Sequence, residues 1–294
     1  DVEVSKITSE LNQGIVPVIT GFQGMNENGD ITTLGRGGSD TTGVALAVAL
    51  NADECQIYTD VDGIFTTDPR VCSKARLLKE VSFEEMLELS SSGAKVLQLR
   101  SVEYASKFNL PIRVLSSFNE GDGTLVQEEK NIMERPIVSG ISSIDTEAKL
   151  TIRGVPDVPG IAAKILSPIS EAGIEVDVIV QNISADNCTD FTFTVDKGDA
   201  ENAKEILQKT SVSLGGGLVE VDHDIAKISV VGRGMRAHAG VASKMFQALA
   251  KDEINISMIT TSEIKISVVI KESEMKKAVT ALHNAFDLDK ELDS

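Results

Sequence analysis

The sequence has few of the residues that cross-link small secreted proteins or bind structural metals. Among its 294 residues there are three cysteines, three histidines and no tryptophan. The cysteines are scattered without a Cys-x-x-Cys pair, so we expect buried thiols in a reducing compartment and no disulfide framework. The histidines have no metal-ligand spacing, and the sequence therefore gives no sign of a metal site.

Long apolar runs and positive net charge are also missing. No run reaches the roughly 18 apolar residues of a membrane-spanning helix, and no signal peptide is visible. A net charge of −17 argues against nucleic acid or a membrane surface as the main partner, because both are anionic. We expect a cytoplasmic protein in which an anionic substrate would need positive charge placed locally.

The first 125 residues alternate strand and helix patterns. Ser82 followed by Glu85 is a capping box that predicts a helix start. Alternating strands and helices indicate a layered, mainly parallel α/β sheet. The expected strands are 15–20, 54–59 and 111–115, and the expected helices are 41–50, 82–90 and 92–108.

An internal repeat follows a polar boundary at 119–135. Residues 153–179 align with 233–259, and Gly160 matches Gly240. Each copy reads strand, glycine turn, helix, strand, strand, helix. The first copy has a closing strand near 217–221, whereas the second ends at the helix 275–286. We therefore expect the spare strand 137–144 to complete the second unit, so that one repeat is inserted in the other.

The stretch GRGGSD, residues 35–40, leads into an apolar helix. Its glycines let backbone amides approach an anion, the helix start adds positive potential, and Arg36 and Ser39 add donors. Asp40 does not suit an anion-binding turn. Two interpretations stay open: Asp40 caps the helix, which the spacing alone favours, or it orients a lysine or a metal.

The stretch TDVDGIFTTDPR, residues 59–70, follows a predicted strand at the end where α/β sheets bind ligands. By itself it is equally well explained as a polar turn. Next to the glycine loop, nucleotide binding becomes the better interpretation. Lys95 would then be available to the phosphates.

The motifs TLGRGGSDTT, YTDVDGIFTTDPR and GAKVLQLRS, in this order before a doubled repeat, resemble the aspartate kinase family, monofunctional type. The resemblance covers essentially the whole chain. It implies an α/β fold: a partial amino-acid kinase fold followed by two ferredoxin-like ACT domains. The implied divisions are the C-terminal part of the kinase domain (1–125), a linker with a donated strand (126–146), an inserted first ACT domain (147–222) and a second (223–294).

The resemblance also implies the chemistry. The family transfers the γ-phosphate of ATP, with Mg²⁺, to the β-carboxylate of L-aspartate, in the pathway to lysine, threonine, methionine and isoleucine. Arg36, Gly38 and Ser39 would hold aspartate, and Asp40 would organise the catalytic lysine. Residue 65 is Phe where many relatives carry Tyr, so the ring is kept but the hydroxyl that could form a hydrogen bond is missing. The ATP-binding candidates are Thr59, Asp60, Phe65, Arg70 and Lys95.

One family feature is missing from the chain. The Lys-Phe-Gly-Gly loop that supplies the catalytic lysine in the family is not found, and the chain opens at DVEVSKI without an initiator methionine. We therefore expect a fragment or processed piece that is inactive as a kinase by itself.

The ACT repeats imply feedback by lysine, threonine or both, and self-association into at least a dimer. The turn DVPG, residues 157–160, offers free amides at a helix start for an amino acid's carboxylate. In the second repeat, the candidates Asn255, Ile256, Ser262 and Glu263 are weaker, because the matching turn lacks both prolines and the acid. The effector candidates are Asp157, Gly160, Ile161, Ala162, Gln181, Asn182, Ser184, Thr192, Asn255 and Ile256.

Two other functions compete with this interpretation. A non-catalytic, amino-acid-sensing regulatory subunit would usually hold only the repeats, whereas this chain also carries half a kinase domain. Another amino-acid kinase, acting on glutamate, carbamate or a nucleotide, would resemble the kinase half without the tandem repeat.

Overall fold

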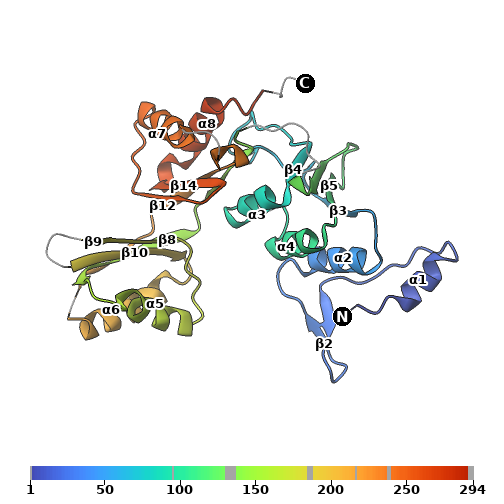
Figure 1. The fold of residues 1–294 in the computed structure, drawn as a ribbon, viewed down its shortest axis with the longest axis horizontal. Coiled ribbons are helices and arrows are strands. Elements are labelled where there is room, and N and C mark those ends of the chain that lie inside the picture. Colours follow the sequence, from blue (N-terminus) through green and yellow to red (C-terminus); the bar gives the residue numbers. More distant parts are fainter. Residues whose placement is uncertain are drawn as a thin grey trace.

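A computed structural model describes residues 2–94, 96–129, 137–183, 188–215, 217–236 and 240–290. The chain forms an N-terminal unit and two repeat units, each with its own sheet (Figure 1). Within these ranges, no helix combines the length and the apolar character needed to cross a membrane.

The N-terminal unit is built on a mixed sheet with the strand order β3-β5-β6-β4. β3 pairs with β5 in parallel and β4 with β6 in parallel, while β5 and β6 are antiparallel. Val44, Met86 and Val102, one from each helix, are fully buried in its core. The elements are β3 (Cys55–Thr59), β4 (Glu80–Ser82), β5 (Ile112–Ser116), β6 (Thr124–Gln127), α2 (Gly38–Ala49), α3 (Phe83–Ser91) and α4 (Leu99–Phe108).

Two local predictions in this unit were wrong. The helix predicted over 92–108 begins only at Leu99. Gly93 has a left-handed φ of 108°, and a Cβ there would lie 2.5 Å from the carbonyl oxygen of Ser143, so a close approach interrupts the helix pattern.

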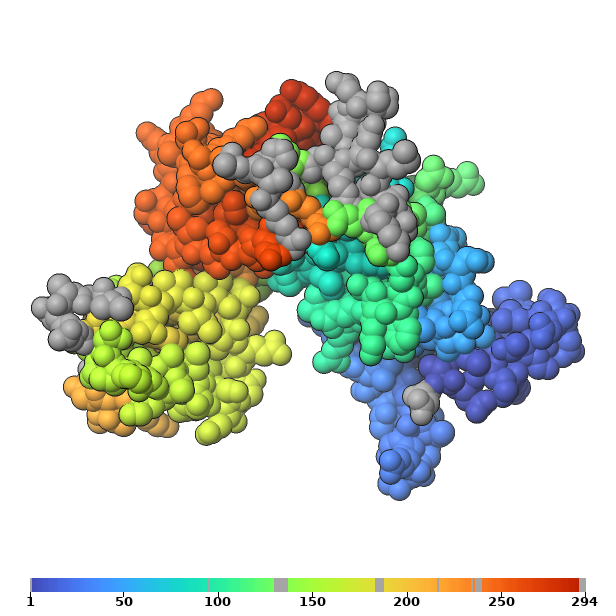
Figure 2. All heavy atoms as spheres, in the orientation of Figure 1, coloured from blue at the N-terminus to red at the C-terminus, as the bar shows by residue number. Residues whose placement is uncertain are grey.

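The predicted strand 15–20 is the second error, because this segment is irregular and mostly exposed. Val16 is 82% and Val18 97% exposed. An apolar run becomes a buried strand only where neighbours pair with it and cover it, and no strand pairing of this segment occurs among the described residues. The segment links α1 (Ser5–Leu11) to the hairpin of β1 (Gln23–Met25) and β2 (Ile31–Thr33), which projects from the molecule (Figure 2).

The first repeat unit, residues 147–222, has an antiparallel sheet in the order β11-β8-β10-β9, covered by two helices. Phe191 and Phe193 point from β10 into the core, where they meet Ile165 of α5. The elements are β8 (Glu147–Pro156), α5 (Ile161–Glu171), β9 (Ile179–Ile183), β10 (Cys188–Asp196), α6 (Ala200–Ser213) and β11 (Val219–Asp222).

The second repeat unit, residues 140–144 and 225–285, has an antiparallel sheet in the order β13-β14-β12-β7. β7 (Gly140–Ile144) precedes the first repeat unit along the chain, yet it pairs with β12, with Ser142 opposite Ser229. The remaining elements are β12 (Ile225–Val231), α7 (Val241–Lys251), β13 (Met258–Thr261), β14 (Lys265–Lys271) and α8 (Met275–Ala285). The fold class expected from the sequence is confirmed.

Candidate functional site

The glycine-rich turn enters α2 through a left-handed residue. Gly37 is the N-cap of α2, with φ at 75°, and the amide of Gly38 donates to the carbonyl of Gly35 at 3.0 Å. A Cβ at Gly37 would lie only 2.0 Å from Cγ of Gln98. Both the backbone conformation and the approach of Gln98 therefore require glycine at this position.

Asp40 lies half-buried in the first turn of α2. The N-cap of this helix is Gly37, so Asp40 is not the N-cap residue of α2. Burial raises the pKa of its carboxyl from the ordinary value, and the nearby backbone N–H of Gln98 partly opposes this rise. In the described part of the chain Asp40 has no ion-pair partner. A partly desolvated carboxylate of this kind would be stabilised by a cation.

Arg36 and Ser39 are exposed on either side of the turn, whereas Gly38 is buried. The hydroxyls of Thr41 and Thr42 donate to the carbonyls of Gly37 and Gly38, at 3.1 and 2.7 Å. These bonds brace the helix start. The turn thus presents a helix N-terminus and one guanidinium to solvent, a combination suited to an anion.

The second candidate region lies at the carboxyl ends of β3 and β5. The amide of Ser117 donates to the carbonyl of Thr59 at 2.7 Å, and the Thr59 hydroxyl donates to Asp60 Oδ1 at 3.2 Å. Asn119 Nδ2 donates to Asp62 Oδ1 at 2.8 Å. Polar groups of two neighbouring parallel strands therefore gather at the edge where such sheets bind ligands.

A hairpin-like loop, residues 64–78, continues from this edge. Leu78 N–H donates to the carbonyl of Ile64, and Phe65 bridges to Leu77. At its far end Arg70 has an 88% exposed side chain and pairs with Asp68 at 2.8 Å. Lys95 lies outside the described residues.

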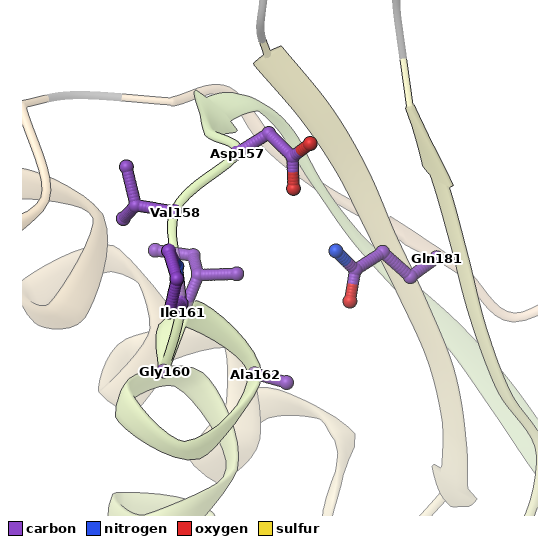
Figure 3. A pocket seen from close by; sticks show the side chains of 7 residues that line it. Asp157, Val158, Gly160, Ile161, Ala162 and Gln181 are labelled. Carbon is purple, nitrogen blue, oxygen red and sulfur yellow. The ribbon is translucent and has the colours of Figure 1, made fainter.

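A cavity of about 420 Å³ opens at the start of α5. Asp157 and Gln181 face it from the turn before α5 and from β9 (Figure 3). Gly160 is the left-handed N-cap of α5, with φ at 88°, and no side chain caps the helix. The cavity thus combines a carboxylate, an amide and a helix N-terminus. Its lining residues are Asp157, Val158, Pro159, Gly160, Ile161, Ala162 and Gln181.

Two effector candidates of the first repeat unit lie on the other face of the sheet. Gln181 stands opposite Phe191, whose ring points to the helices, so the pleat directs Asn182 and Thr192 to the opposite side. The Thr192 hydroxyl bonds that of Thr151 at 3.0 Å. Ser184 lies outside the described residues.

The candidates in the second repeat unit lie in different settings. Asn255 is exposed, and Ile256 packs against the core of the unit. The hydroxyl of Ser262 donates to Glu88 of α3 at 3.1 Å, which makes it a contact between units.

Sequence reasoning missed three side chains that support these regions: Gln98, Asn119 and His283. Gln98 contacts the glycine turn, Asn119 holds Asp62, and His283 contacts the loop 64–78. Gln98 lies within the motif GAKVLQLRS, but only Lys95 of that motif was given a role, and Asn119 and His283 belong to no motif; each of the three acts on a partner distant in sequence. Only the positions of Gln98, before a helix, and Asn119, after a strand, could have drawn attention to them.

Comparison with known families gives three matches. Residues 1–116 match the amino acid kinase family, and residues 150–211 and 228–286 each match an ACT domain. An aspartate kinase of Pseudomonas putida is 62% identical over 289 residues, which are 98% of this chain and 70% of that protein.

Two solved structures of Escherichia coli aspartokinase III are also similar. The complex with aspartate and ADP has 30% identity and a TM-score of 0.78 over 95% of this chain. The complex with lysine and aspartate has 30% identity and a TM-score of 0.76 over 96%. This chain spans 62% of the length of each of these chains, less than two thirds.

Proposed function

The chain belongs to the aspartate kinase family, and from this premise we propose that the full-length gene product transfers the γ-phosphate of ATP to the β-carboxylate of L-aspartate. The observation that carries the proposal is the glycine turn at α2, a shape suited to an anion, in a chain 62% identical to an aspartate kinase. The aspartate and ADP held by E. coli aspartokinase III support the same substrates.

We propose separate roles for the two candidate regions. Arg36, Gly38 and Ser39 bind the carboxylates of aspartate through the guanidinium, the helix amides and the hydroxyl. Asp40 orients the catalytic lysine. Burial disfavours the charged form of this carboxyl and raises its pKa, and a neighbouring ammonium group would stabilise that charge. The ATP-binding residues of the proposal are Thr59, Asp60, Phe65, Arg70 and Lys95.

Phosphoryl transfer between two anions depends on positioning and on neutralising charge. Mg²⁺, when bound, supplies part of that neutralisation. The described residues contain no cluster of three or more potential metal ligands. A Mg²⁺ held mainly by the nucleotide phosphates would need only one or two carboxylates from the protein, and we propose Asp60 after β3 as one of them.

The direct test of the activity is acyl phosphate formation by the full-length gene product, trapped as the hydroxamate. We expect a product that requires both ATP and aspartate; no product with aspartate would contradict the proposal. Arg36→Ala should raise the KM for aspartate by about tenfold or more, because hydrogen bonds to charged groups contribute about 1.5–3 kcal/mol. A change in the KM for ATP alone would contradict the role of Arg36.

We also propose that the cavity at α5 binds lysine, threonine or both as feedback effectors. The amides at the start of α5 would take the effector's carboxylate and Asp157 its ammonium. The lysine bound to E. coli aspartokinase III supports an amino-acid effector in this family. Gln181 adds a neutral donor and acceptor from β9.

Calorimetric titration with lysine and threonine tests this site. Asp157→Asn should weaken effector binding by about tenfold, because a charge-assisted bond becomes a neutral one. Glu171→Gln removes the same charge at the other end of α5 and should leave binding unchanged. If neither amino acid binds the parent protein, the effector proposal is wrong while the kinase proposal stands.

For the assembly, we propose self-association through the edges of the repeat-unit sheets at β9, β11 and β13, since the fourth edge, β7, is covered by the loop 64–78. Exposed edge strands offer unpaired backbone groups for such pairing. We place the enzyme in the cytoplasm. Sedimentation of the full-length protein should give a dimer or larger species, and a monomer at micromolar concentration would contradict this assembly.

A further inference from the structure

The second repeat unit holds the loop 64–78 at Thr66. The Thr66 hydroxyl lies 2.9 Å from Nε2 of His283 in α8, and the two residues are 217 positions apart. The Thr66 carbonyl accepts the amide of Ile141 in β7 at 2.7 Å. Thr66 and His283 are both 0% exposed. One loop residue is therefore bound by two elements of a different unit.

The packing around Thr66 makes the same connection. Val71 and Cys72, at the far end of the loop, pack in the hydrophobic core of the second repeat unit. Gly140 of β7 brings its backbone so close that a Cβ there would lie 3.1 Å from the Thr66 carbonyl oxygen. Lys74 Nζ donates to Asn284 beside His283 at 3.3 Å. The loop is thus anchored on α8 and β7.

The anchored loop also carries candidate nucleotide contacts. Phe65 is adjacent to Thr66, Arg70 lies four residues further on, and Thr59 and Asp60 precede the loop. Asp60 and Arg70 are exposed, so packing does little to hold their side chains in place. The amide of Arg76 donates to the Thr66 hydroxyl at 3.0 Å, which joins the two arms of the loop at the anchored residue.

We propose that His283 is a positioning residue for the nucleotide site: through Thr66 it holds the loop 64–78, and with it the ATP contacts, against the second repeat unit. The inference rests on the proposed function for its assignment of ATP to this loop. Through this link, the affinity for nucleotide depends on the position of α8 relative to the loop 64–78. Binding energy that is gained only in a fixed loop geometry is lost when the loop is released.

The chemistry of the imidazole suits a link that works in the neutral state. A neutral ring can accept a hydrogen bond from the Thr66 hydroxyl at Nε2 or, in the other tautomer, donate one from Nε2–H. A protonated ring carries N–H groups on both nitrogens, and Nδ1 is buried without a hydrogen-bond partner among the described residues. Burial lowers the pKa of His283; the nearby charges are Asp289, which opposes this, and Lys74 and Arg76, which add to it.

Steady-state kinetics of the full-length enzyme tests the link. His283→Leu and Thr66→Val should each raise the KM for ATP by about three- to tenfold, the usual worth of one hydrogen bond. The KM for aspartate should change less than twofold. The double variant should match Thr66→Val, because Thr66→Val already removes the bond to His283 together with the acceptor of the Arg76 amide. His283→Gln, whose amide can replace Nε2, should restore most of the ATP affinity.

A matched control separates positioning from general loss of stability. Val268→Ala truncates a fully buried side chain of β14 in the same hydrophobic core but removes no hydrogen bond to the loop. It should lower the melting temperature and leave the KM for ATP unchanged. Equal effects of Val268→Ala and His283→Leu on that KM would overturn the proposal, as would equal effects of His283→Leu on the KM for aspartate and for ATP.

Calorimetric binding of ADP to the same variants keeps the two proposals distinguishable. If the parent protein binds ADP but does not phosphorylate aspartate, the proposed function fails, and weaker ADP binding by His283→Leu still supports the positioning role. If the parent protein does not bind ADP, or if His283→Leu binds it as tightly as the parent, the positioning role is wrong.

Discussion

At the scale of the residue, the glycine turn depends on the absence of a side chain at Gly37. Its left-handed φ disfavours any side chain, and Gln98 occupies the space where a Cβ would stand. Gly35 has a similar φ of 80°, but no atom lies within 4 Å of the place that its Cβ would take. A side chain at Gly35 would therefore cause backbone strain alone, whereas a side chain at Gly37 would cause both backbone strain and a steric clash.

Gly37→Ala should therefore destabilise the protein more than Gly35→Ala. Each substitution costs about 1–2 kcal/mol for the left-handed conformation, and only Gly37→Ala also displaces the side chain of Gln98. Urea unfolding of both variants measures the difference. Equal free energies of unfolding would mean that the Gln98 contact relaxes without cost.

His283 gives a prediction on pH. Its pKa is lowered by burial below the ordinary 6.5, so the unfolded chain binds the proton more readily. Its contribution to stability is complete above pH 6.5 and is lost as the pH falls towards the lowered pKa. We expect a smaller fall in melting temperature between pH 7.5 and 5.5 for His283→Gln than for the parent protein. Parallel pH profiles would contradict this.

At the scale of the element, the start of α3 is fixed by its own sequence. The capping box predicted from Ser82 and Glu85 is confirmed, with both of its bonds formed. Glu85 is 5% exposed and also accepts the hydroxyl of Ser139 at 2.6 Å. The carboxylate thus joins α3 to the segment that leads into β7, a role that the local motif does not reveal.

Substituting Glu85 should consequently lower the free energy of unfolding more than substituting the N-cap residue Ser82. Ser82→Ala should lower the free energy of unfolding by about 1 kcal/mol. Glu85→Ala should lower it by about 2–3 kcal/mol, because two buried hydroxyls and an amide lose their acceptor. Glu84→Ala, at an exposed neighbour that pairs with Arg233 at 3.4 Å, is the control and should cost no more than about 1 kcal/mol. Chemical denaturation of the three variants measures these values.

At the scale of the whole molecule, the two repeat units are joined by a buried cation. Lys227 of β12, with 4% of its side chain exposed, pairs with Glu147 of β8 at 2.6 Å and with Asp177. Lys197 and Glu272 join the same units at 2.5 Å, but their side chains are 31% and 41% exposed. The structure therefore offers a buried and an exposed ion pair across one junction.

The buried and the exposed ion pair should contribute very different amounts to the free energy of unfolding. Lys227→Met should destabilise the protein by about 3–5 kcal/mol, because it leaves Glu147 buried and unpaired. Adding Glu147→Gln should recover much of the loss. Lys197→Met should cost no more than about 1 kcal/mol, as is usual for an exposed pair. Thermal and urea unfolding of the parent protein and the three variants compares them, and equal costs for the two lysines would contradict this account.

The sequence alone determined the features that depend on local chemistry. The α/β class, the doubled unit, the helix start at Ser82 and the family resemblance follow from periodicity, turn residues and motifs, whose information lies within a few residues of each position. The domain boundaries and the roles of the site residues stay proposals.

Only the tertiary structure decided what depends on distant partners. It left 15–20 exposed, delayed α4 to Leu99 and brought His283 to Thr66. The fates of these segments depend on packing between residues up to 217 positions apart, and no local pattern encodes such contacts. Burial and hydrogen bonding depend on the whole folded chain. A short segment of sequence therefore predicts its own secondary structure better than it predicts the residues that will pack around it.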